Sequence, residues 1–185
     1  MTRTELARQI YHAAHLTGTF RLRSGVISSY YFDKYQFESD PILLRAIARE
    51  LAPQVPTGTE IIAGPEMGAI PLATALSFET GLPAVFVRKT PKEYGTRRQV
   101  EGIDVADRTV LLIEDVVTSG GQLIESAQVL RDLGAIVHTT LVVILRAGNA
   151  RELLGASGLT LKPLFLMDEI EQAATDKPGV SPDTI

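Results

Sequence analysis

Apolar and polar residues follow two rhythms along this chain, and these predict strands and helices in alternation. Short apolar runs rich in β-branched side chains predict strands at residues 60–63, 84–87, 110–113, 137–145 and 161–166. Apolar residues at helical spacing predict helices at residues 68–80, 122–133 and 147–154, with Gly134 placed to cap the second. This alternation predicts an α/β fold with a mainly parallel twisted sheet flanked by helices on both faces.

The N-terminal part of the chain has a different pattern. Helical spacing over residues 4–16 predicts a first helix that stops at Gly18. The runs at residues 19–22 and 30–35 predict two strands around a turn at Ser24-Gly25. A small hood formed by a hairpin is therefore expected ahead of the main sheet.

A single domain is expected over residues 1–185, because this length suits one core with a small appendage. Asp40-Pro41 is a typical helix start, an N-cap followed by proline in the first turn, and that helix should reach about residue 51. We place the hood at about residues 1–37, the core at about 38–170 and a loose polar tail at about 171–185.

The composition excludes several classes of protein. Hydrophobic residues make up 45% and charged residues 22%, as in ordinary globular enzymes, and the net charge of −4 argues against a nucleic-acid partner. The chain has no cysteine, so disulfides and thiolate metal sites are excluded. No apolar run approaches the roughly 18 residues of a membrane span, and no signal peptide opens the chain. We expect a cytoplasmic protein with no membrane partner.

The segment TVLLIEDVVTSGGQ, residues 109–122, carries the strongest chemical signal. An apolar run is followed by two acids, Glu114 and Asp115, then by a small loop rich in glycine and hydroxyl groups, and then by a helical pattern. Such a loop offers N–H groups and hydroxyls to a phosphate at the positive end of a helix. The acids beside it are suited to ribose hydroxyls or a magnesium ion. The alternative is a plain exposed turn, which has no need of two acids.

Three other predicted strands also end in polar or glycine-rich residues. They are followed by GPEMG at residues 64–68, by Arg88-Lys89 and by Arg146. Ligands of open α/β sheets bind beyond the carboxyl ends of the strands, so these ends are expected to form one site. Basic residues continue from Arg88 to Arg98; such a run is usually a solvated face, but its place directly after a buried strand favours a specific anion.

Residues 110–121 resemble the signature of the type I phosphoribosyltransferases that binds phosphoribosyl pyrophosphate (PRPP). The family pattern of apolar residues, two acids, two apolar residues and a small Thr-containing loop stands here as VLLI-ED-VV-TSGG. The motifs G-x-x-x-x-G-K-[ST] and G-x-G-x-x-G are both absent from the chain. The resemblance implies that Glu114 and Asp115 hold the ribose hydroxyls, directly or through Mg²⁺. It also implies a 5′-phosphate site made of Val116, Val117, Thr118, Ser119, Gly120, Gly121 and Gln122.

Two further segments resemble the orotate phosphoribosyltransferases. RKTPKEYG at residues 88–95 is similar to the family's RK-x-x-K-x-x-G stretch, and FRLRSG with SSYYFD in residues 20–33 is similar to its hood. The resemblance implies that the pyrophosphate of PRPP is bound by Arg88, Lys89 and Lys92, largely in the neighbouring subunit's site, so a homodimer with shared active sites is expected. It implies that orotate is bound by Arg23, Tyr31, Phe32, Thr118 and Arg146.

The chain departs from the family pattern at a few positions. Arg23 stands where lysine is usual, Gly68 stands where relatives often carry lysine, Tyr94 stands where histidine is common, and Leu145 stands where an acid usually precedes the arginine. The family often has a non-prolyl cis peptide in the loop at residues 64–68. The resemblance thus extends over about residues 18–150, with these differences inside the site.

The function that we expect is transfer of the phosphoribosyl group from PRPP to orotate, giving orotidine 5′-monophosphate and pyrophosphate in pyrimidine nucleotide biosynthesis. Lys92, Arg88, Lys89 and Asp115 are the expected catalytic residues, acting by electrostatic stabilisation with Mg²⁺ as cofactor. Two alternatives stay open: a phosphoribosyltransferase for another nucleobase, and a non-catalytic regulator that senses PRPP. The hood and Arg146 argue against a purine, which has no carboxylate.

Overall fold

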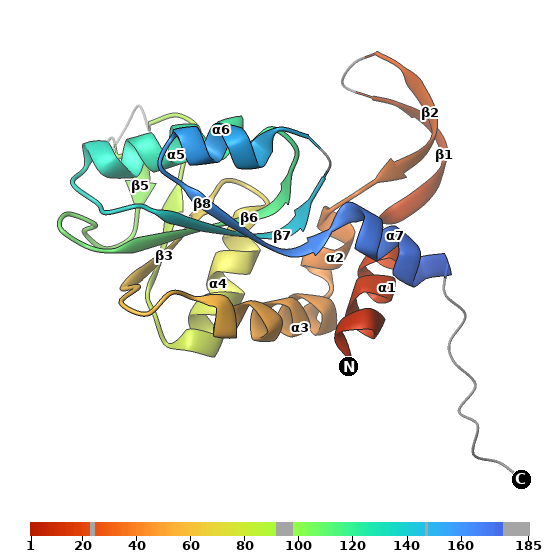
Figure 1. Ribbon diagram of the computed structural model, residues 1–185, viewed down its shortest axis with the longest axis horizontal. Helices are drawn as coiled ribbons and strands as arrows, with labels where there is room; N and C mark the ends of the chain where they lie inside the picture. The colour runs from red at the N-terminus through yellow and green to blue at the C-terminus, as the bar shows by residue number, and fades with distance from the viewer. Residues whose placement is uncertain (23–24, 92–97, 147, 176–185) are drawn as a thin grey trace, which may run out of the picture.

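A six-stranded sheet in the order β5-β4-β3-β6-β7-β8 forms the centre of the molecule (Figure 1). The computed structural model describes residues 1–22, 25–91, 98–146 and 148–175. The strands are β3 (Ile61–Pro65), β4 (Ala84–Val87), β5 (Val100–Glu101), β6 (Val110–Val117), β7 (Thr139–Leu145) and β8 (Thr160–Leu166). All neighbours pair in parallel except β5, which runs antiparallel to β4.

Helices cover both faces of this sheet, which confirms the predicted α/β architecture (Figure 1). One face is covered by α1 (Arg3–Ala14), α2 (Tyr35–Ser39), α3 (Pro41–Leu51) with the short helix η1 (Ala52–Gln54), α4 (Ala69–Thr80) and α7 (Met167–Thr175). The other face is covered by α5 (Gly121–Asp132) and α6 (Ala150–Ala156).

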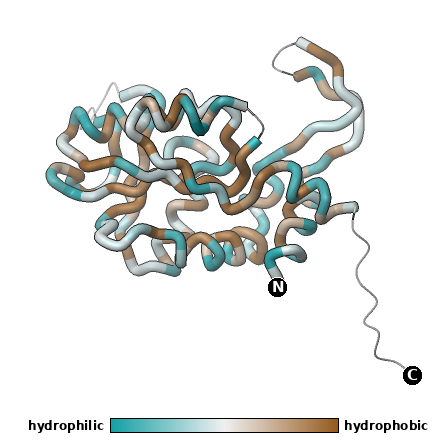
Figure 2. Tube along the Cα trace, viewed as in Figure 1, coloured by the Kyte–Doolittle hydropathy of each residue, from teal (hydrophilic) through white to brown (hydrophobic). Residues whose placement is uncertain are grey.

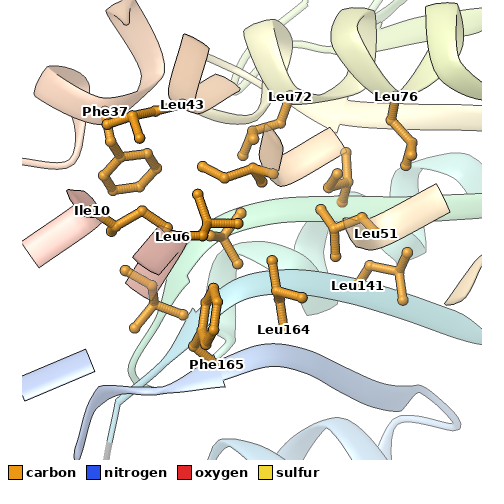
Figure 3. Close-up of a cluster of buried hydrophobic side chains, with 14 of the residues drawn as sticks. Leu6, Ile10, Phe37, Leu43, Leu51, Leu72, Leu76, Leu141, Leu164 and Phe165 are labelled. Atoms are coloured by element: carbon orange, nitrogen blue, oxygen red, sulfur yellow. The ribbon is translucent and has the colours of Figure 1, made fainter. Parts of the chain in front are cut away.

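The two faces bury separate hydrophobic clusters, because successive strand residues point to opposite sides. In β3, Ile62 packs on the α4 side and Ile61 on the α5 side, and every residue of this strand is buried. Figure 2 shows the hydrophobic stretches gathered in the sheet. Figure 3 shows the larger cluster, to which α1 contributes Leu6 and Ile10. The N-terminal helix is therefore part of the main core.

The hood is an antiparallel hairpin of β1 (His15–Arg21) and β2 (Ile27–Phe32) that extends away from the sheet (Figure 1). The predicted helix end is wrong, because α1 ends at Ala14 and Gly18 lies inside β1. The physical reason is strand pairing: His15 and Leu16 pair with Phe32 and Tyr31 of β2, and the His15 ring stacks 4.7 Å from Tyr11 and 5.3 Å from Tyr30 between centroids.

Sequence periodicity also missed the short helix α2. The second hood strand ends at Phe32 and does not reach residue 35 as predicted. Asp33 ends it, because its Oδ1 accepts a hydrogen bond of 3.1 Å from the Tyr35 N–H and so turns the chain into α2. This helix places Phe37 in the core.

The predicted start of the loose tail, at about residue 171, is too early, because α7 continues to Thr175. Ile170 and Ala173 are buried in the same cluster as α1, and Arg8 Nε donates a hydrogen bond of 2.9 Å to the Ala173 carbonyl. A short polar-looking segment is thus held by packing against the first helix. The tail beyond residue 175 lies outside the described residues.

Phe37→Ala is expected to lower the free energy of unfolding by about 3–5 kcal/mol, since it leaves a cavity at a side chain that is 0% exposed. Urea unfolding followed by circular dichroism measures this. Phe78→Ala is the matched control: Phe78 is 84% exposed, so its loss should change the free energy by no more than about 0.5 kcal/mol. Equal losses for the two variants would contradict the placement of α2.

Candidate functional site

The strand order creates a crevice between the carboxyl ends of β3 and β6. The connection after β3 leads into α4 on one face, and the connection after β6 leads into α5 on the other. The two loops therefore separate at this point, which is the switch point where open α/β sheets bind ligands. The glycine-rich segment 64–68, the acids of β6 and the start of α5 all lie here, as the strand ends predicted.

The loop after β6 lines a hollow of about 210 Å³, together with Lys34, Glu114 and the first residues of α5. We call this the loop hollow. Thr118 and Ser119 are exposed, and Gly120 is buried with a φ of 80°, a left-handed conformation that suits glycine. The free N–H groups of the first turn of α5 come directly after it. The loop hollow thus has the shape and the donors of an anion site.

The loop after β7 packs on the same hollow from the far side. A Cβ atom on Gly148 would lie 2.9 Å from the carbonyl oxygen of Thr118, so only glycine permits this approach. The Arg146 N–H donates a hydrogen bond of 2.9 Å to the Val117 carbonyl, which continues the parallel pairing of β6 and β7 to their ends. Arg146 is thereby fixed beside the loop.

The two acids lie inside β6, which corrects the expectation that the strand ends before them. Glu114 is 7% exposed and Asp115 is 0% exposed. Asp115 accepts a hydrogen bond from the Val116 N–H, and Glu114 Oε1 accepts one of 3.1 Å from the Asp115 N–H. The strand continues because these local hydrogen bonds and nearby side chains satisfy the carboxylates that burial would otherwise exclude.

Two site residues were not predicted from the sequence, and both come from the segment of α2. Lys34 Nζ lies 2.5 Å from Asp115 Oδ2 and donates a hydrogen bond to it. Glu38 is 5% exposed, and neither of its carboxyl oxygens has a hydrogen-bond partner in the described part of the chain. Glu38 reaches the two acids because it lies on α2, a helix too short for sequence periodicity to predict.

Crowding of carboxylates shifts the ionisation of this cluster. Burial, and then the charge of Asp115, raises the pKa of Glu38 to about 9 and the pKa of Glu114 to about 8. Burial alone would lower the pKa of Lys34, but the charge of Asp115 and the hydrogen bond to it outweigh burial, so its pKa is raised. Lys34 is therefore a permanent cation in a site where Glu38 holds a proton.

The loop after β3 comes unusually close to this ion pair. The peptide between Glu66 and Met67 is cis, as the resemblance implies for this loop. A Cβ atom on Gly68 would lie 1.8 Å from Asp115 Oδ2 and 2.9 Å from Lys34 Nζ. No side chain can be accommodated at Gly68 without moving the carboxylate, which explains glycine at this position.

The basic strand end after β4 lies across the crevice from the loop hollow. Arg88 Nε donates a hydrogen bond of 3.1 Å to Glu101, and the Lys89 N–H donates one of 2.6 Å to Glu66 Oε1. A second hollow, of about 310 Å³, is lined by Arg88, Lys89 and the start of α5, including Gln122. The structure thus brings Arg88 and Lys89 to the same edge as the loop. The predicted residues Lys92 and Tyr94 lie outside the described residues.

The predicted base-binding residues are only partly brought together. The Arg146 guanidinium carbon lies 5.8 Å from the centre of the Phe32 ring. Tyr31 precedes Phe32 on β2 and so points to the opposite side, where its ring centroid is 5.7 Å from that of Phe20. Phe32 and Arg146 can therefore face one ligand, while Tyr31 faces away from it. Arg23 lies outside the described residues.

Comparison with known proteins agrees with this geometry. The family model of the phosphoribosyl transferase domain matches residues 36–157. The chain is 45% identical over 168 residues to the orotate phosphoribosyltransferase of Nocardioides sp. (strain ATCC BAA-499 / JS614), with 91% of this chain and 94% of that protein covered. It is 44% identical over 161 residues to the orotate phosphoribosyltransferase of Pyrococcus furiosus, with 85% and 88% covered.

Solved structures agree with the sequence comparison. The crystal structure of Mycobacterium tuberculosis H37Rv orotate phosphoribosyltransferase in complex with PRPP has a TM-score of 0.79 and 26% identity, covering 91% of this chain and 98% of that chain.

Within residues 1–22, 25–91, 98–146 and 148–175, no helix has the length and apolar character needed to cross a membrane.

The stability of the protein without substrate is expected to fall as the pH rises, because folding raises the pKa of Glu38 and, to a smaller extent, that of Glu114. In the folded state Glu38 keeps a proton that it releases in the unfolded chain above its ordinary pKa of 4.5. The stability that this bound proton contributes is therefore lost progressively as the pH rises towards about 9. We expect a loss of roughly 2 to 4 kcal/mol between about pH 5 and about pH 9 in urea unfolding without Mg²⁺.

Glu38→Gln, which keeps a neutral side chain of the same shape, should remove much of this pH dependence. Glu152→Gln, at an exposed position on α6, is the control and should leave the dependence as it is. An unchanged slope in the Glu38 variant would show that another group is responsible.

Proposed function

The chain belongs to the phosphoribosyl transferase domain family, and we propose that it is an orotate phosphoribosyltransferase, which transfers the 5-phosphoribosyl group from PRPP to orotate. The products are orotidine 5′-monophosphate and pyrophosphate. In this reaction a ring nitrogen of orotate forms a bond to C1 of the ribose while the bond from C1 to the pyrophosphate oxygen breaks, with inversion at C1. This places the protein in pyrimidine nucleotide biosynthesis.

One observation carries this proposal most directly: the loop hollow lies against two buried carboxylates of the same strand. Thr118, Ser119 and the N-terminus of α5 offer donors to the 5′-phosphate of PRPP. Glu114 and Asp115 offer acceptors to the 2′- and 3′-hydroxyls. Neighbouring sites for a phosphate and a sugar diol suit the ribose 5-phosphate part of PRPP.

The basic edge supplies charge for the leaving group. Arg88 and Lys89 line the second hollow beside α5, and their charges are offered to the pyrophosphate of PRPP, largely that bound by the neighbouring subunit. The reaction passes through a state with positive charge on the ribose and growing negative charge on pyrophosphate, so fixed cations at this point lower the barrier. We propose Arg88, Lys89 and Lys92 for this role, with Asp115 holding the ribose in line.

The orotate site is proposed to lie between the hood and the end of β7. Arg146 offers a planar, permanently charged fork to the carboxylate of orotate, and Phe32 offers an aromatic face beside it. Arg23 and Thr118 complete the proposed set, and Tyr31 contributes to the shape of the hood from its other face.

Mg²⁺ is the cofactor that we propose. Among residues 1–22, 25–91, 98–146 and 148–175, no group of three His, Cys, Asp or Glu side chains could hold a metal ion by itself. The acids present fit an ion held largely by PRPP oxygens with Glu114 or Asp115 as a protein ligand, because Mg²⁺ at phosphate sites takes few protein ligands. Bound there, it would neutralise charge on the pyrophosphate.

A homodimer with shared active sites is also part of the proposal. Its support is the likeness of the basic segment from Arg88 onwards to a segment that, in the orotate phosphoribosyltransferases, meets PRPP largely in the neighbouring subunit's site. Size-exclusion chromatography with light scattering would test it, since a monomer that is fully active at low concentration is incompatible with sharing.

The decisive test of function is the loss of orotate absorbance when the protein is mixed with PRPP and Mg²⁺. We expect turnover with orotate and none with hypoxanthine or adenine. Turnover with a purine alone would identify a phosphoribosyltransferase for another base. PRPP binding without turnover of any base would identify a sensor of PRPP.

Arg146→Ala is expected to raise the KM for orotate by about tenfold or more, since it removes a charge-assisted contact to the carboxylate. The KM for PRPP should change less than twofold. Arg151→Ala, an exposed arginine on α6, is the matched control and should leave both constants unchanged. Equal effects on both substrates would place Arg146 outside the orotate site.

A further inference from the structure

Lys34 is the one residue of the loop hollow whose charge is opposite to that of the neighbouring acids, among the described residues that line it. It lies 81 positions from Asp115 in the sequence, and its ammonium reaches that carboxylate at 2.5 Å. The sequence motifs of the site do not include it. Its position on the wall of the hollow gives it access to whatever anion the loop binds.

We propose that Lys34 is a PRPP-binding residue that exchanges partners when the substrate enters. In the structure its ammonium neutralises Asp115. When PRPP binds, the ribose hydroxyls take over Asp115, and the ammonium of Lys34 turns to an anionic oxygen of the substrate. This assignment rests on the proposed function, because it names a further contact in the same site.

The exposure of the two partners supports an exchange over a purely structural ion pair. The side chain of Asp115 is 0% exposed, whereas that of Lys34 is 33% exposed and faces the loop hollow. An ammonium has three N–H donors, and Asp115 occupies one of them. The bond to Asp115 therefore leaves the ammonium with capacity for a further hydrogen bond to an anionic ligand in the loop hollow.

The contact at Gly68 shows how tightly the pair is enclosed. The loop after β3 comes so close that a Cβ on residue 68 would lie 2.9 Å from the Lys34 ammonium. The Asp115 carboxylate, at 1.8 Å, occupies the place where a side chain of residue 68 would begin, and the Lys34 ammonium lies directly beside it. The cation beside the two acids is thus Lys34, which directly precedes α2. At Gly68 the loop after β3 brings only backbone atoms close to the pair.

The substrate offers a replacement for each partner of the ion pair. Asp115 holds the Lys34 ammonium by its charge and by one hydrogen bond. The hydroxyls of a ribose can satisfy Asp115 by hydrogen bonds without adding charge. The flexible lysine stem can then carry the ammonium to a phosphate oxygen, where a stronger charge-assisted bond forms.

Isothermal titration calorimetry of PRPP in the presence of Mg²⁺ tests the assignment. Lys34→Met keeps the length of the side chain and removes the charge, and we expect the Kd for PRPP to rise about tenfold or more. Lys34→Arg keeps the charge and should recover part of the affinity. Lys162→Met, the same change at an exposed position on β8, is the matched control and should bind like the unaltered protein.

A second pair of variants, made in protein that carries Asp115→Asn, separates a contact of Lys34 with PRPP from a role of Lys34 in neutralising Asp115. In Asp115→Asn a neutral carboxamide replaces the buried carboxylate, so a counter-ion is no longer needed for folding. If Lys34→Met still weakens PRPP binding about tenfold in this background, the ammonium contacts the substrate. If Lys34→Met has no further effect there, Lys34 serves only Asp115 and the inference is overturned.

The unaltered protein distinguishes this inference from the function on which it rests. Unaltered protein that binds PRPP and turns over orotate, with a Lys34→Met variant of equal PRPP affinity, overturns the role of Lys34 alone. Unaltered protein that binds no PRPP overturns both.

Discussion

The buried carboxylate of Asp115 is the constraint around which the site is arranged. It lies within a central strand and is 0% exposed, so it needs a cation and hydrogen-bond donors close by. Lys34 supplies the cation, which requires α2 to pack next to β6. Gly68 follows from the same requirement, because any side chain there would strike the carboxylate. An energetically costly acid in a strand thus accounts for features on three separate elements.

The parallel sheet explains how these elements come to share one edge. Because β3 lies between β4 and β6, the helices that follow β3 and β6 lie on opposite faces. The loops part there and leave room for a ligand. Backbone groups at the start of α5 face the acids across this gap, and the basic end of β4 closes its other side. Anionic and diol-bearing parts of one ligand can then be bound by neighbouring loops of a rigid sheet.

Sequence patterns predicted the sheet and the principal loops well, because continuous apolar runs are typical of strands buried on both faces. They failed where particular side-chain contacts, and not periodicity, decided the structure. The ring stack of Tyr11, His15 and Tyr30 accompanies the strand pairing that ends the first helix early, and Asp33 starts a helix too short to show periodicity. The last helix was taken for part of a tail, since its few buried residues acquire their packing partners only from α1.

The candidate site shows the same division. The motif from Val110 to Gln122 by itself determined that two acids and a loop of hydroxyls and glycines follow one apolar run, and so predicted an anion site beside a sugar-diol site. Only the tertiary structure decided that the acids stay inside the strand, that Phe32 and not Tyr31 faces Arg146, and that Lys34 reaches Asp115. Those outcomes depend on which segments meet in space, and contacts between residues far apart in the chain leave no periodic trace in a single sequence.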